Sequence, residues 1–314
     1  MAEVIKTATR DAYGKALVEL GEKNKNVVVL DADLAAATKT GAFKKAFPER
    51  FFDTGIAESN MMSLAGGLAT TGFTVFASTF AMFAAGRAFE QVRNTICYPH
   101  LNVKIGATHA GISVGEDGAS HQCCEDIALM RSIPGMVIIN PADDIEARAA
   151  VFAAAEHDGP VYMRFGRLAV PRVFDENYKF EIGKAVTLKE GTDVTIIATG
   201  LMVNEAIEAA KTLEEEGISV ELINMHTIKP LDNEAVIKAA KKTGCIVTAE
   251  EHNIIGGLGS AVSEVVAEEY PVPVVRVGVN DEFGKSGPAV ELLQLYGLDA
   301  KNIVEKAKLA ISKK

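Results

Sequence analysis

The chain has 314 residues, of which 48% are hydrophobic and 24% are charged. This composition is typical of a globular protein with enough sequence for two domains, and it excludes a disordered chain. The formal net charge of −10 is spread along the sequence, which argues against nucleic acid or an anionic membrane as the main partner.

The N-terminal stretch carries charges throughout, and no window reaches the roughly 18 apolar residues that a membrane-spanning helix needs. We therefore expect a cytoplasmic protein. The four cysteines have neither the spacing of a zinc site nor the density of a secreted disulfide scaffold, so we expect reduced thiols and no metal site on this chain.

The first part of the chain predicts a helix over 6–24 and then a buried strand over 27–34 that ends in carboxylates. Asp31 and Asp33 therefore stand where ligand crevices form in α/β proteins, at the carboxyl end of a parallel strand. The next helix, 59–71, is built from small residues and contains two glycines. Glycine weakens an isolated helix, so we expect this one to be buried or to lie in a subunit interface.

Strands and helices then alternate along the whole chain, which predicts an α/β fold of two parallel-sheet, three-layer domains. Further strands are expected at 73–78, 103–109, 136–141, 159–167, 193–200, 219–226, 245–252 and 273–279, and helices at 80–97, 121–133, 143–157, 202–217, 233–243 and from about 257. The pattern weakens over 169–190, which is the linker that we expect between domains 1–168 and 191–314.

Glu58 is a lone carboxylate among small and apolar residues, at the start of the uncharged helix. One interpretation is a surface carboxylate stabilised by the helix dipole. A helix without a charged face has to be buried, however, and buried carboxylates are often functional. Phe80 and Phe83 are three residues apart on the predicted helix 80–97 and share a face, either as core residues or as a platform for a planar heterocycle.

Three polar residues of the glycine-rich segment THAGISVGEDGASHQ form the strongest part of the candidate site. His109 follows a predicted strand, Asp117 lies in a turn, and His121 begins the next predicted helix, and such positions bind ligands in parallel sheets. The alternative is a set of loop residues with local hydrogen bonds. Arg164 and Arg167 end the last strand of the first domain, where a guanidinium could bind a phosphate or form a salt bridge across the linker.

The segments DTGIAESNM, STFAMF, THAGISVGEDGASHQ, SIPGMVIINPADDIEA and GPVYMRFGR together resemble the pyrimidine-binding domain of the transketolases. The segments TGLMVNEA and AEEHNIIGGLGSAVSE are similar to the C-terminal domain of that family. The resemblance covers nearly the whole chain and implies a pyrimidine-binding domain at 1–168 and a transketolase C-terminal domain at 191–314.

The resemblance implies thiamine diphosphate as the cofactor and assigns residues to it. Glu58 would hydrogen-bond N1′ of the aminopyrimidine, and a carboxyl group in dry surroundings can donate such a bond near neutral pH. Phe80 and Phe83 would flank the pyrimidine ring, and Asp33 would also lie at the cofactor.

The same resemblance implies the substrate residues. Asp117 would bind a donor hydroxyl, His121 would act near the reacting carbon, and His109 with Arg164 and Arg10 would bind phosphate. The chain departs from the family in that Ala37 replaces a serine of the phosphate site, Ala57 and Ser59 flank Glu58 in place of arginine and histidine, and Met163 and Phe165 flank Arg164.

The GDG motif that holds Mg²⁺ and the diphosphate in these enzymes is not found in this chain. The resemblance therefore implies the C-terminal subunit of a two-chain transketolase of the pentose phosphate pathway, which transfers a two-carbon ketol unit between sugar phosphates. The Mg²⁺ ligands would lie on an N-terminal partner, in an α2β2 heterotetramer around a homodimer core.

Three alternatives remain open at this point. The chain could be the β subunit of a 2-oxo-acid dehydrogenase, or half of an enzyme like deoxyxylulose phosphate synthase. It could also be a non-catalytic homologue that only binds a partner, although the joint presence of Glu58, Asp117 and His121 argues against that.

Overall fold

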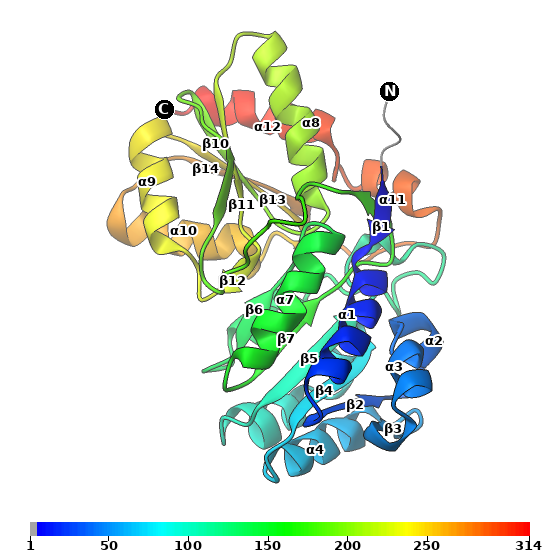
Figure 1. The fold of residues 1–314 in the computed structure, drawn as a ribbon. Coiled ribbons are helices and arrows are strands. Elements are labelled where there is room, and N and C mark those ends of the chain that lie inside the picture. The colour runs from blue at the N-terminus through cyan, green and yellow to red at the C-terminus, as the bar shows by residue number, and fades with distance from the viewer. Residues whose placement is uncertain (1–4) are drawn as a thin grey trace.

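The strands of the computed structural model, which describes residues 5–314, form a large sheet, a second sheet and one short strand pair (Figure 1). In spatial order, the large sheet contains β12 (Thr227–Lys229), β6 (Val137–Ile139), β7 (Val161–Arg164), β5 (Val103–Thr108), β4 (Thr74–Phe80), β2 (Val27–Asp31) and β3 (Phe51–Asp53). The second sheet contains β14 (Val274–Val279), β13 (Ile246–Asn253), β10 (Val194–Ala198), β11 (Val220–Asn224) and β9 (Val186–Lys189). The predicted α/β class, with mostly parallel sheets, is confirmed.

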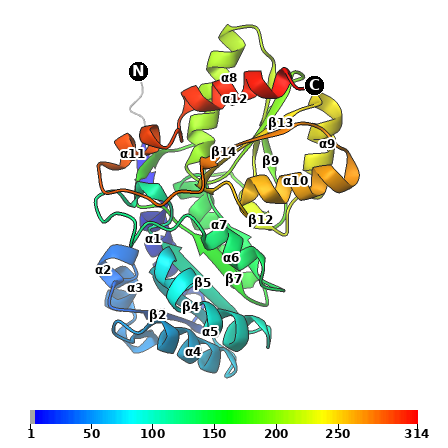
Figure 2. The same cartoon turned by 180° about the vertical axis from the view of Figure 1, so that it is seen from behind.

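Alternate residues of the buried strands enter two cores, one on each face of the large sheet. Val27 and Val29 of β2 pack on one face, where α1 (Thr9–Lys23) and α7 (Asp144–Glu156) cover the sheet (Figure 1). Val28 and Leu30 pack on the other face, which α4 (Glu58–Ala69), α5 (Phe89–Gln91) and α6 (Asp126–Arg131) cover (Figure 2). The period of two along a strand thus builds the three layers.

The second sheet is covered in the same way. One core lies under α8 (Met202–Glu215) and α12 (Ala300–Ile311), and the other lies under α9 (Asn233–Thr243) and α10 (Leu258–Glu269). The shorter elements are α2 (Ala35–Thr38), α3 (Gly41–Ala46), α11 (Ala289–Leu295), the 3-10 turns Pro48–Arg50 and η4 (Ile112–Val114), and the π-helical turns Phe83–Arg87 and Val92–Cys97. No helix of residues 5–314 is both long and apolar enough to cross a membrane.

Three antiparallel pairings depart from the expected parallel pattern. β1 (Lys6–Ala8) pairs with β8 (Ala169–Pro171), so the predicted helix 6–24 begins only at Thr9. β9 is antiparallel to β11, and β12 of the C-terminal region is antiparallel to β6 at the edge of the large sheet. The range 169–190, expected as a linker, therefore contains β8 and β9, and the two parts of the chain share a sheet edge.

Buried hydrogen bonds join the two parts of the chain, and a buried ion pair within the first part orients one of the donors. Arg164 Nε pairs with Asp126 Oδ2 at 2.8 Å, and Arg164 Nη2 donates to the carbonyl oxygen of Glu251 on β13 at 2.8 Å. Glu146 of α7 accepts hydrogen bonds from Tyr178 at 2.5 Å and from Asn224 of β11 at 2.8 Å. Because a buried charge without a partner is costly, these contacts fix how the two parts sit on each other.

Glu146 makes the stability of the chain depend on pH. Burial raises the pKa of Glu146 from 4.5 to about 7, so between these values the unfolded chain releases a proton that the folded chain keeps. The free energy of unfolding should therefore fall as the pH rises from about 4.5 to about 7, by up to about 1.4 kcal/mol per pH unit from this one group. Glu146→Gln should flatten the slope measured by urea unfolding.

Glu19→Gln is the matched control, because Glu19 is a surface carboxylate paired with Arg148 at 2.6 Å. This variant should keep the slope of the parent protein. Superimposable slopes for the parent and Glu146→Gln would contradict the assignment.

Candidate functional site

The candidate site forms at the carboxyl ends of three adjacent strands of the large sheet. In the register of the sheet, Asp31 of β2 pairs with Ser78 of β4, and Phe80 of β4 pairs with Thr108 of β5. The segments that follow these strands therefore start side by side. This edge is where ligands bind in open parallel sheets.

Four of the predicted site residues form one aromatic cluster at this edge. The Phe80 and His109 rings stack with their centroids 3.8 Å apart, and the Phe80 and Phe83 rings stack at 5.7 Å. His121 contacts the edge of Phe83 at 5.5 Å. The structure thus brings Phe80, Phe83, His109 and His121 together.

The local structure around three of these residues differs from the prediction. Phe80 is the last residue of β4, not the first residue of a helix, and Phe83 begins a π-helical turn. Single π-helical turns are often found at functional sites. His121 precedes α6, which begins at Asp126, so it lies in a turn and not on the predicted helix 121–133.

Glu58 is 1% exposed and begins α4. Its Oε2 accepts a hydrogen bond from Arg87 Nη1 at 2.8 Å, and the Arg87 guanidinium lies over the Phe83 ring at 4.5 Å. Within residues 5–314, the buried Glu58 Oε1 has no hydrogen-bond partner. A buried carboxyl oxygen without a hydrogen-bond partner is costly, so this atom is a place where a hydrogen-bonding group of a ligand would be stabilised.

Arg87 is a site residue that the sequence reasoning missed. Its side chain is half exposed and reaches both Glu58 and the aromatic cluster. The signal in the sequence was a single cation in the apolar stretch FAMFAAGRAF.

His109 is 3% exposed and has a positive φ of 56°. Its Nε2 lies 2.9 Å from Arg10 Nη1, and its Nδ1 lies 2.9 Å from Thr108 Oγ1. Because a guanidinium can only donate, Nε2 accepts and Nδ1–H donates to Thr108. Burial, together with the nearby charges of Arg10, Arg167 and Lys39, lowers the pKa of His109 to about 3, so the ring is neutral in the physiological range.

Three cations therefore surround His109 at this edge. Arg10 also donates to the carbonyl oxygen of Ala37 at 3.0 Å, and burial lowers its pKa. Lys39 has a positive φ of 71°, as does Asp33 at 63°. Non-glycine residues with positive φ are uncommon and gather at functional sites, and here Asp33 and Lys39 follow β2 while His109 follows β5 at the same edge of the sheet.

Asp31, expected at the ligand crevice, orders the chain between β2 and α3. Its carboxylate accepts hydrogen bonds from the Leu34 amide at 2.6 Å and from the Thr38 and Thr40 hydroxyls at 2.7 and 2.8 Å. Burial raises the pKa of Asp31 to about 6. Both carboxylate oxygens of Asp31 thus accept hydrogen bonds from the chain itself, whereas Asp33 is exposed.

Two predicted substrate residues lie apart from the cluster. Asp117 is exposed in the turn after η4, and no hydrogen bond or ion pair in the described part of the chain joins it to the other site residues. Arg164 is 3% exposed and bonded to Asp126, Cys123 and Glu251, so its predicted contact with a substrate phosphate does not fit the structure. Arg167 reaches the site edge instead, donating to Val114 and pairing with Glu116 at 3.1 Å.

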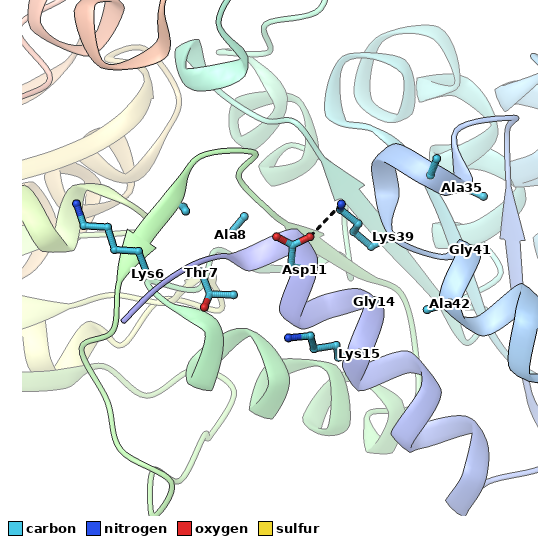
Figure 3. Close-up of a pocket in the computed structure, with 12 residues that line it drawn as sticks. Lys6, Thr7, Ala8, Asp11, Gly14, Lys15, Ala35, Lys39, Gly41 and Ala42 are labelled. Carbon is cyan, nitrogen blue, oxygen red and sulfur yellow. Dashed lines mark ion pairs between the residues drawn. The ribbon is translucent and has the colours of Figure 1, made fainter. Parts of the chain in front are cut away.

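A surface pocket of about 510 Å³ adjoins the cationic side of the site (Figure 3). Asp11 of α1 and Lys39 point toward each other in it and form an ion pair at 3.2 Å. It is lined by Lys6, Thr7, Ala8, Asp11, Gly14, Lys15, Ala35, Ala36, Lys39, Gly41, Ala42 and Ala169. The pocket therefore shares with the site the segments that carry Arg10 and Lys39, and no residue of the aromatic cluster lines it.

Possible metal ligands and thiols are placed as follows in the described part of the chain. In residues 5–314, no three or more His, Cys, Asp or Glu side chains are grouped so that they could hold a metal ion. The four cysteines, Cys97, Cys123, Cys124 and Cys245, are buried free thiols, and burial raises the pKa of each.

Two domain models and several known proteins are similar to this chain in sequence. The model of the transketolase pyrimidine binding domain matches residues 5–172, and that of the transketolase C-terminal domain matches residues 183–303. The chain is 54% identical over 300 residues to the "Putative transketolase C-terminal section" of Methanocaldococcus jannaschii, covering 95% of this chain and 94% of that protein. It is 46% identical over 298 residues to the 6-deoxy-6-sulfo-D-fructose transketolase subunit of Clostridium sp. (strain MSTE9), covering 95% and 92%.

A solved structure described as a split gene transketolase, inactive beta4 tetramer, superposes on this chain with a TM-score of 0.92. The two sequences are 59% identical, and the superposition covers 98% of this chain and 99% of that chain.

The protonation state of His109 can be measured directly. Because its pKa is lowered to about 3, ¹⁵N NMR of the chain should show a neutral ring with the proton on Nδ1 from about pH 5 to about pH 8. The His109→Gln variant assigns the signals. Titration of His109 with a midpoint near the ordinary value of about 6.5 would contradict the geometry.

Proposed function

The chain belongs to the transketolase family, and from that premise we propose that it is the C-terminal subunit of a two-chain transketolase. In this proposal it transfers a two-carbon ketol unit from a ketose phosphate to an aldose phosphate, with thiamine diphosphate bound between this chain and an N-terminal subunit. The observation that carries the proposal is the buried Glu58 carboxylate, which has one unpaired oxygen beside a cluster of aromatic rings.

The residues present fit the aminopyrimidine end of the cofactor. Glu58 Oε1 is buried and lacks a hydrogen-bond partner within residues 5–314, and the Phe83 ring contacts both the Arg87 guanidinium and the Phe80 ring. We propose that Glu58 holds a ring nitrogen of the pyrimidine while Phe80 and Phe83 orient the ring and exclude water. When bound, thiamine diphosphate supplies a reactive carbon and an electron sink, which side chains cannot provide.

The cationic side of the site fits a substrate that ends in phosphate. The charges of Arg10, Lys39 and Arg167 all lower the pKa of His109, so these three cations lie near it. Guanidinium groups bind phosphate through paired hydrogen bonds. We propose that these cations and the neutral His109 bind the phosphate, Asp117 binds a donor hydroxyl, and His121 acts near the reacting carbon. Arg167 takes the role that the sequence reasoning gave to Arg164.

We further propose that the N-terminal subunit holds the diphosphate and Mg²⁺, since this chain contains no GDG motif. The apolar side chains Phe52 of β3, Ile56 and Leu64 of α4 are 39%, 76% and 41% exposed. Exposed apolar side chains are often covered at protein interfaces. We propose that these three lie in the homodimer core of an α2β2 assembly.

Reconstitution tests the proposal. The chain is mixed with its co-purifying N-terminal subunit, thiamine diphosphate and Mg²⁺, and assayed with xylulose 5-phosphate and ribose 5-phosphate. We expect turnover by the complex and none by either chain alone. Turnover only with pyruvate and glyceraldehyde phosphate, or only with a sugar sulfonate, would replace the proposed reaction, and no turnover at all would overturn it.

Glu58→Gln tests the cofactor residue. This variant should fold and assemble like the parent, because glutamine has the same shape and can still accept from Arg87. It cannot hold a pyrimidine nitrogen in the same way, so kcat should fall by at least about a hundredfold, in the range of general acid–base contributions. Glu90→Gln, on the exposed surface, is the control. A fall in kcat of only a few fold would show that Glu58 has another role.

Arg167→Ala tests the phosphate residue. Loss of a charge-assisted hydrogen bond costs about 1.5–3 kcal/mol, so KM for the phosphorylated acceptor should rise about 10- to 100-fold. The rate with glycolaldehyde, which lacks a phosphate, should stay within about twofold. Arg148→Ala, which removes an exposed ion pair, should change neither value. Equal effects on both acceptors would argue against phosphate binding by Arg167.

A further inference from the structure

The C-terminal part of the chain holds the loop that carries Asp117 and His121. Gln122 is 4% exposed, and its Nε2 lies 3.1 Å from the Ile112 carbonyl oxygen and 3.3 Å from that of Gly115, at the start of the loop. The same atom lies 2.9 Å from the carbonyl oxygen of Lys285, after β14. Carbonyl oxygens only accept, so the side-chain NH₂ group of Gln122 connects both ends of the loop to the C-terminal part.

The backbone of the segment 284–287 packs closely against this loop. A Cβ atom added at Gly284 would lie 1.7 Å from Gln122 Oε1, and one at Gly118 would lie 2.4 Å from Ser286 Oγ. Neither position has room for a side chain without a shift. The segment 284–287 and the loop that carries Asp117 and His121 therefore pack closely against each other.

Two more contacts hold the same loop from the same side. Glu251 Oε1 on β13 accepts a hydrogen bond from the Ser113 amide at 2.6 Å. Ile112 is fully buried in the core of the second sheet, and α11 packs on η4, where the chain after β14 runs beside the loop (Figure 2). The beginning of the loop is thus part of the C-terminal core.

Asp117 makes no hydrogen bond or ion pair to the other predicted site residues in residues 5–314, so its position depends on the backbone of the loop. The loop closes on itself through Gly118 N to the Gly115 carbonyl at 3.1 Å and His121 N to the Gly118 carbonyl at 3.0 Å. The side-chain Nε2 of Gln122 also donates a hydrogen bond to the Gly115 carbonyl oxygen. A shift at Gln122 would therefore move Asp117 and His121 together.

We propose that Gln122 is a positioning residue through which the segment 284–287 sets the place of Asp117 and His121 relative to Phe83. The C-terminal domain then has a part in the reaction, as the support of the substrate loop. The link to catalysis rests on the proposed function, whereas the link between the two segments does not.

Amide hydrogen exchange of the chain alone tests the link between the segments. Gln122→Met keeps the length of the side chain but removes its donors, so exchange at Gly115, Gly118 and His121 should rise about five- to tenfold. The strands β10 and β11 should exchange as in the parent. Gln294→Met, at an exposed glutamine of α11, is the matched control and should change nothing.

The Gly284→Ala variant changes the same contact from the C-terminal side. It takes the place of Gln122→Met in the exchange experiment if that variant does not fold. Its added Cβ displaces the Gln122 side chain, so it should raise exchange at the same three amides. Unchanged exchange at these amides in a folded variant would overturn the proposal.

The reconstituted complex tests the link to catalysis. In the Gln122→Met complex, KM for the donor ketose should rise at least about fivefold, while the Kd for thiamine diphosphate stays within about twofold. If exchange rises and KM does not, the loop is held by Gln122 without effect on the substrate, and this part of the proposal fails. If the parent complex shows no turnover, the proposed function fails and the exchange result still decides the link.

Discussion

The register of β2, β4 and β5 is the constraint on which the site depends. These strands pair in parallel, so their carboxyl ends meet at one edge and the segments after them start within reach of each other. Phe80 and His109 stack because their strands end side by side, and Arg10 reaches His109 from the start of α1. A shift of one residue in this register would turn these side chains to the other face.

The charges at this edge are arranged in two parts. On one side the buried Glu58 accepts a hydrogen bond from Arg87 through one oxygen, and its other oxygen has no partner in the described part of the chain. On the other side Arg10, Lys39 and Arg167 lie near the neutral His109. Their positive charge favours binding of the anionic end of a substrate. The aromatic rings lie between the two parts, so a molecule with a flat ring and one with a phosphate can meet there.

The alternation of strands and helices predicted the fold class because buried parallel strands are continuous apolar runs between amphipathic helices. His109 and His121 were expected at one site because they stand at a predicted strand end and a predicted helix start, whereas the place of Phe80 and Phe83 in that site came from the family resemblance. The start of α1 and the edge strand β12 could not be predicted, because they depend on pairing with strands far along the chain. The burial of Arg164 depends in the same way on Asp126 and on β13, whereas its sequence position only showed a strand end.

The central claim is that Glu58 and the aromatic rings of this chain hold the pyrimidine of thiamine diphosphate, while a second chain holds its diphosphate. A structure of the two-chain complex with thiamine diphosphate and Mg²⁺ tests it most directly. We expect a pyrimidine nitrogen within hydrogen-bond distance of a Glu58 carboxyl oxygen and the ring against Phe80 and Phe83. A cofactor bound elsewhere, with Glu58 contacting only Arg87, would contradict it.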